Sequence, residues 1–199
     1  MIFLAAVFLF LIYLAVSVLV VWLAVKAARR FGIKGWKWGV PAALVMYAIV
    51  FWDHIPTLVL HKYYCATKAG FWVYKTPEQW KKENPGVAET LTWRERSPTY
   101  KGSDGSHGYR VNQRFKWEYR KIPTVPLFPV TVGSQSIVDV KTGEVMVRRV
   151  TVSSGYGSIG GGADPNSWKF WVGSEPCVPN TREYGMYEDA FKKMGREVQ

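Results

Sequence analysis

The chain has 199 residues, a formal net charge of +11, and 48% hydrophobic and 16% aromatic residues. The mean hydropathy of -0.06 does not describe a uniform chain. Residues 1–60 contain one acidic residue, whereas residues 61–199 contain 14 acidic and 21 basic residues. The second part is long enough to bury a core of its own.

Residues 1–25 carry no charged side chain. About 20 apolar residues cross the hydrocarbon core of a bilayer, so this run is long enough to span it with some tilt. A cleaved signal peptide has a basic start and an apolar core of roughly 7–15 residues. No charge precedes the run here, and the run is longer. We therefore predict a retained membrane helix over about residues 2–25.

A basic loop over residues 26–37 separates this run from a second apolar run at about 38–60. The loop has no acidic residue, and its basic residues are Lys26, Arg29, Arg30, Lys34 and Lys37. The positive-inside rule places such a loop in the cytoplasm. The sequence thus predicts a transmembrane hairpin over residues 1–60. Its N-terminus and the domain of residues 61–199 then face the periplasm of a bacterium.

Asp53 and His54 interrupt the second apolar run. An ionisable residue within a span is a functional-site hypothesis by default. The pair has three possible partners: a partner helix, each other, or Lys62. The alternative is simple solvation near the outer interface. Pro56 is expected to kink the helix. His54 and His61 lie about 10 Å apart along a helix, too far to share one ion, so we expect no metal or other cofactor.

The two cysteines are Cys65 and Cys177. Both fall in the part of the chain predicted to face an oxidising compartment, where two cysteines most often pair. Lipidation and a free reactive thiol are the alternatives. A bridge requires the two Cα atoms to lie about 4.4–6.8 Å apart.

The domain is predicted to be α+β, a small antiparallel sheet with a few helices. Alternating or β-branched runs predict its strands. A capping signature at Thr76 predicts a helix over 77–84. The predicted strands are 71–75, 109–122, 136–140, 144–152 and 168–172, and a last helix is predicted from Thr181. A bridge would bring strand 168–172 beside strand 71–75.

Three stretches read "CATKAGFWVYKT", "IVDVKTGEVMVRR" and "WKFWVGSEPCVP". Their order resembles a group of uncharacterised bacterial envelope proteins with a similar cysteine–tyrosine opening, a D-x-K-T-G-E-V hairpin and a closing tryptophan–cysteine–proline segment. The resemblance covers roughly residues 63–179 discontinuously. It implies a Cys65–Cys177 pair and a periplasmic setting. It transfers no catalytic residue.

No catalytic constellation emerges from the sequence. Ser158 lacks the glycine that a nucleophile elbow places two positions before the serine. Asp104 and His107 fall in a polar loop without evident partners. A basic and aromatic stretch is more prominent, and its main residues are Arg94, Arg96, Arg110, Arg114, Lys116, Trp117 and Arg120. The predicted compartment argues against nucleic acid as its ligand. Anionic lipid, a cell-wall polymer and an acidic protein are the candidates, and a merely solvated strand is the alternative.

The sequence therefore predicts an interaction protein that is anchored in the bacterial inner membrane and binds a protein or another envelope partner. A blocking, exclusion or immunity role would be one form of that function. The alternatives are an accessory subunit of a larger membrane complex and an envelope enzyme of unrecognised class.

Overall fold

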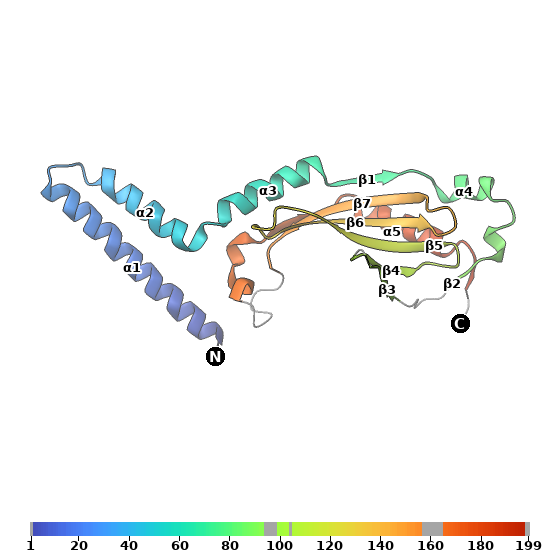
Figure 1. The fold of residues 1–199 in the computed structure, drawn as a ribbon, viewed down its shortest axis with the longest axis horizontal. Coiled ribbons are helices and arrows are strands. Elements are labelled where there is room, and N and C mark those ends of the chain that lie inside the picture. Colours follow the sequence, from blue (N-terminus) through green and yellow to red (C-terminus); the bar gives the residue numbers. More distant parts are fainter. Residues whose placement is uncertain (1, 94–98, 104, 157–164, 198–199) are drawn as a thin grey trace. The chain divides into compact units, whose positions relative to one another are not determined.

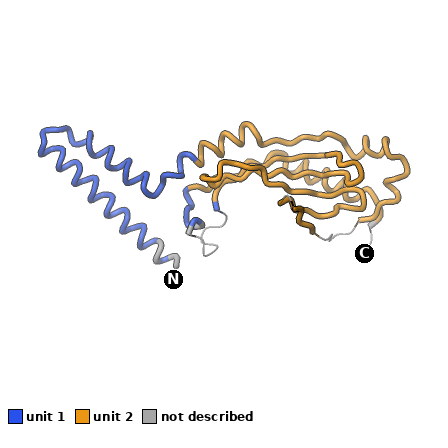
Figure 2. Tube along the Cα trace, viewed as in Figure 1, with its two compact units in different colours: residues 1–56, 156–171 blue, residues 57–155, 172–199 orange. Residues whose placement is uncertain are grey.

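The computed structural model describes residues 2–93, 99–103, 105–156 and 165–197. The chain divides into two compact units, coloured separately in Figure 2. Unit 1 comprises residues 1–56 and 156–171, and unit 2 comprises residues 57–155 and 172–199. The sequence prediction had divided the chain between residues 60 and 61.

Two helices form most of unit 1: α1 (Ile2–Arg30) and α2 (Trp36–Phe51). They pack closely because glycines stand just before the start of α2 and one turn later. A Cβ atom on Gly35 or Gly39 would lie 2.8 or 2.7 Å from a methyl group of Val25. Farther along the pair, the Tyr13 hydroxyl donates to the carbonyl of Met46. Small residues at such a crossing are typical of membrane helix pairs.

The predicted second span is broken. α2 ends at Phe51, and α3 (His54–Thr67) begins after a sharp bend. Pro56 explains the break, because a proline cannot donate to the carbonyl four residues earlier, here that of Trp52, and its ring clashes with it. Among the described residues, one helix, over Val7–Arg30, is long and apolar enough to cross a membrane; a second crossing requires α2 and α3 to count as one broken span. The fold therefore has one clear span, not two straight ones.

Unit 2 is an antiparallel sheet with helices, as the predicted α+β class requires (Figure 1). The strand order is β1-β7-β6-β5-β4-β3, and β8 also pairs with β7. The strands are β1 (Gly70–Val73), β3 (Thr99–Lys101), β4 (His107–Arg110), β5 (Phe115–Ile122), β6 (Val130–Asp139), β7 (Val145–Ser154) and β8 (Ser174–Cys177). A separate parallel pair joins β2 (Thr92–Trp93) to β9 (Arg196–Glu197).

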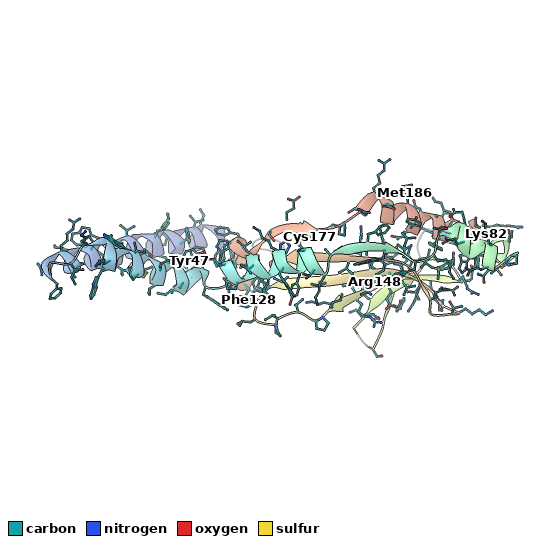
Figure 3. The ribbon with its side chains drawn as sticks, turned by 90° about the horizontal axis from the view of Figure 1, so that it is seen from above. Tyr47, Lys82, Phe128, Arg148, Cys177 and Met186 are labelled. Atoms are coloured by element: carbon teal, nitrogen blue, oxygen red, sulfur yellow. A yellow bond between two sulfur atoms is a disulfide. The ribbon has the colours of Figure 1, made fainter. Side chains whose placement is uncertain are left out.

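One face of the sheet is covered by α5 (Thr181–Lys192), which Figure 3 shows along one side of the sheet with Met186 labelled. Alternation along the strands turns the apolar side chains of this face inward. The core beneath α5 also receives Trp80 from the short helix α4 (Pro77–Glu83). Its central members are Trp80, Phe115, Ile137, Val147, Tyr184 and Phe191.

The opposite face carries a second, smaller core under α3. Tyr64 is buried there against Val132, Val150 and Val152, and Leu60 packs beside it. The predicted span had assigned Leu60 to the membrane. Instead, this part of α3 belongs to unit 2 and covers one half of the second face. The other half of that face is hollowed, and forms the site described below.

The β6–β7 hairpin is anchored by one buried carboxylate. Asp139 Oδ1 accepts from the backbone N–H groups of Lys141 and Thr142 at the turn. Asp139 Oδ2 accepts from the Trp80 indole at 3.0 Å and from the Arg114 guanidinium at 2.8 Å. Gly143 closes the turn with φ +73°, a left-handed value that favours glycine. Asp139 thus joins the turn to the main core.

Several predicted elements are confirmed. The Thr76 capping box is present, and α4 spans residues 77–83, one residue short of the predicted end. The strand predicted at 168–172 is wrong: two 3-10 turns, Pro165–Trp168 and Phe170–Val172, occupy it. The last strand of the large sheet is β8, and it reaches the same edge of β7 as β1 without pairing with β1. The final helix ends at Lys192 and is followed by β9.

Asp139 makes the fold sensitive to acid. Burial opposes its charge, but the hydrogen bonds from Arg114 and Trp80 outweigh burial and lower the pKa of Asp139. A lowered folded-state pKa stabilises the fold above the unfolded pKa and ceases to do so as pH falls. Urea unfolding in detergent, followed by tryptophan fluorescence, should therefore show stability declining below about pH 4.

The variant Asp139→Asn should lose about 2–3 kcal/mol at neutral pH and show a weaker decline in acid. Asp189→Asn is the control, because Asp189 is an exposed carboxylate paired with Lys193 at 3.8 Å. Equal acid sensitivity of the wild type and the Asp139→Asn variant would contradict this role.

Candidate functional site

The uncovered half of the second sheet face contains two adjoining hollows in unit 2, which together we call the basic trough. The first, of about 460 Å³, is lined mainly by Lys116, Glu118, Arg120, Ser134, Ser136 and Arg148. The second, of about 300 Å³, is lined by Lys68, Trp72, Tyr74, Ile122, Arg148 and Val150. Because Arg148 and Ile122 line both hollows, the trough runs across β5, β6 and β7 to β1.

Strand pairing explains why these side chains meet. Glu118 lies opposite Ser136, Ser136 lies opposite Arg148, and Arg148 lies opposite Trp72. Directly paired residues point to the same face of a sheet. The trough is therefore built on rigid strands, with a polar floor and aromatic side chains at the β1 end.

The basic side chains of the trough have different hydrogen-bond partners. Lys116 and Arg120 both pair with Glu118. Burial opposes the charge of Glu118, yet these hydrogen bonds lower its pKa, so the carboxylate stays ionised. Arg148 instead donates from Nε to the Ser134 hydroxyl at 3.0 Å, and within the described part of the chain no carboxylate lies at ion-pair distance from it. The trough therefore has a positive charge that its own acids do not balance.

The residues of the predicted basic and aromatic surface do not lie on one face of the sheet. Lys116 and Arg120 reach the trough. Trp117 points to the opposite face and stacks on Tyr109 at 5.2 Å. Arg114 is held by Asp139, and Arg110 is exposed on β4. Arg94 and Arg96 lie outside the described residues.

Sequence reasoning missed Trp72, Tyr74 and Arg148. A signal for all three was present. Alternation along "GFWVY" places Trp72 and Tyr74 on one side of the strand. The adjacent Arg148 and Arg149 must point to opposite faces, and Arg149 is buried against the Tyr184 ring at 4.3 Å.

Asp53 and His54 do not pair with each other. Asp53 is 1% exposed and accepts from Lys169 at 2.8 Å and from the Trp171 indole at 3.0 Å. All three residues belong to unit 1. His54 Nδ1 shares a 2.7 Å hydrogen bond with the Tyr47 hydroxyl. Asp53 therefore ties the segment before β8 to the break between α2 and α3.

The cysteines form a disulfide with a Cα–Cα distance of 5.9 Å. It links α3 to β8 next to the second core. The buried His61 lies one turn before Cys65, with Nε2 3.6 Å from its sulfur. These three side chains have the spacing of a metal group. Because the sulfurs are bonded to each other, neither is available as a thiolate ligand.

Of the residues considered for catalysis, the structure describes His107. His107 is on β4, not in a loop, and its described ring contacts are Tyr119 at 4.8 Å and Trp117 at 6.4 Å. These neighbours offer no acid to orient its imidazole. Asp104 and Ser158 lie outside the described residues.

No protein-family model matches the chain, and no curated protein or solved structure is detectably similar to it. The resemblance to bacterial envelope proteins stays a prediction.

The disulfide gives a prediction about stability. Cys65→Ser and Cys177→Ser should each lower the free energy of unfolding by about 2–4 kcal/mol, because either change opens the same loop. The double variant should cost little more than one change, since the pair acts as a unit. Thermal unfolding measures both effects. Mass spectrometry of unreduced protein that finds free thiols at both positions would contradict the bridge.

The Asp53 contact gives a second prediction. Lys169→Met leaves a buried carboxylate without its cation, so unfolding should become easier by about 1–3 kcal/mol. Adding Asp53→Asn should recover part of that loss, because the unpaired charge is removed. Limited proteolysis near residue 169 and thermal unfolding would measure the two steps. Strictly additive losses would show that the two side chains do not act as a pair.

Proposed function

We propose that the protein is an interaction protein anchored in the bacterial inner membrane, with its N-terminus and unit 2 on the periplasmic side. α1 supplies the anchor, since it meets the length and apolarity requirements of a span. The basic residues of 26–37 favour a cytoplasmic loop between α1 and α2. The disulfide supports an oxidising compartment for unit 2.

The surface of α3 also supports a membrane-proximal position for that helix. Ile55, Val59 and Tyr63 are each about 60% exposed at intervals of four residues, which places them on one side of the helix. The opposite side buries His61 and Tyr64. An apolar stripe beside Lys62 and Lys68 is typical of a helix at the bilayer surface.

One observation carries the binding role: the trough exposes aromatic and arginine side chains on the half of a sheet face that α3 leaves uncovered. Tryptophan, tyrosine and arginine dominate the energy of protein interfaces. Trp72 is 42% exposed and Tyr74 58% exposed. A partner protein in the envelope is the class of ligand that such a face fits best.

Reporter fusions test the orientation. A reporter fused after Gln199 should be active only in the periplasm, and one inserted near Gly32 only in the cytoplasm. The opposite pattern would overturn the proposed location.

Purification of the full chain in mild detergent tests the role. A stoichiometric protein partner is expected, whereas repeated isolation of the chain alone would count against an interaction protein.

A further inference from the structure

The geometry points to a specific occupant of the trough: we propose that it binds an acidic segment of a partner protein, with Arg148 as the anchor. This inference rests on the proposed function and adds the site and the chemistry of the partner. Three features support it: the charge of Arg148, the aromatic side chains beside it, and the partial burial of Arg148.

Arg148 differs from Arg114 and Arg120, the arginines on and just before β5. Arg114 is neutralised by Asp139, and Arg120 is paired with Glu118. Arg148 uses one of its five N–H donors on Ser134. The other donors remain for a ligand that enters either hollow, because Arg148 lines both. A guanidinium binds a carboxylate through two parallel hydrogen bonds, which makes it a selective anchor for an acidic side chain.

The aromatic side chains extend the site beyond one charge. Trp72 and Tyr74 line the second hollow beside Arg148. A Cβ atom on Gly70 would lie 2.3 Å from the Trp72 ring, so the glycine leaves room for the indole to lie against β1. The ring is thereby held in place while 42% of the residue stays exposed. Such a fixed, half-exposed aromatic residue packs well against the chain that flanks an acidic side chain.

The burial of the site favours a protein segment over a lipid surface. Arg148 is partly buried, and its hydrogen-bond partner Ser134, which lines the first hollow, is 6% exposed. A flat bilayer reaches side chains that project, whereas a carboxylate on a flexible side chain can enter a hollow. Glu118 would repel an acid near Lys116 and Arg120. The entering carboxylate is therefore directed to the Arg148 end of the trough.

Binding assays on the full chain in nanodiscs of zwitterionic lipid test this site. The probe is a fluorescein-labelled polyglutamate peptide, measured by anisotropy. Arg148→Ala should weaken binding about tenfold, as expected for the loss of a charge-assisted hydrogen bond. Trp72→Ala should also weaken it, and Arg148→Lys should restore binding only in part, because a lysine binds a carboxylate through a point charge. Added salt should weaken binding by the wild type.

Arg182→Ala is the matched control, since it removes the same charge from an exposed position on α5. Thermal unfolding of each variant checks that it is folded. If Arg148→Ala and Arg182→Ala weaken peptide binding equally, the peptide is held by diffuse charge attraction and not by a site, and the proposal is overturned. Arg148-dependent binding of phosphatidylglycerol vesicles or polygalacturonate, without peptide binding, would overturn it in favour of a lipid or glycan site.

Failure of this proposal is distinguishable from failure of the proposed function. A partner that co-purifies equally well with Arg148→Ala would remove the trough as the site and leave the interaction role intact. Conversely, the chain could bind the peptide through Arg148 and yet yield no partner in cells. That result would keep the trough as a binding site and contradict the proposed interaction function.

Discussion

The two-faced sheet of unit 2 is the constraint on which the rest of the structure depends. Three long neighbouring strands, β5, β6 and β7, alternate on both sides of one register shift at Ile137/Val138, so each face receives a different set of side chains. One face is apolar and is closed by α5. The other is divided between a small core under α3 and the polar trough. A one-residue shift in the register of β7 would exchange Arg148 with Arg149 and destroy both the core and the trough.

The break at Pro56 makes this division possible. A straight helix after α2 would continue the apolar run to Leu60. Ending α2 at Phe51 lets the next turns of α3 join unit 2, where Tyr64 closes the second core and Cys65 reaches β8. The disulfide then fixes the helix against the strand that ends the sheet. One missing backbone donor thus explains why the same apolar run is shared between α2 of unit 1 and α3 of unit 2.

Much of the fold follows from local patterns in the sequence. The Thr76 cap, the β6–β7 hairpin and the alternation of β5 are encoded by neighbouring residues, so they were predictable. The course of α3 was not, because its buried side chains include Thr57 and His61 while Ile55 and Val59 are exposed. Hydropathy alone would place Ile55 and Val59 on the buried side of α3, which is the opposite of what the structure has. The alternation of 168–172 was equally misleading, since Lys169 and Trp171 point to Asp53 and not into a sheet. The trough depends on pairing between distant strands, which composition does not reveal.

The contact of Asp53 with Lys169 and Trp171 bears on how the protein can be divided. Between β7 and β8 the chain leaves unit 2, contributes residues 156–171 to unit 1, and returns. Unit 2 is therefore not one contiguous stretch of sequence. A gene fragment beginning at residue 57 would encode Lys169 and Trp171 without the carboxylate that receives them. Recombination that moves the sheet domain onto another helix pair must carry, or replace, an acidic residue at the end of the second helix.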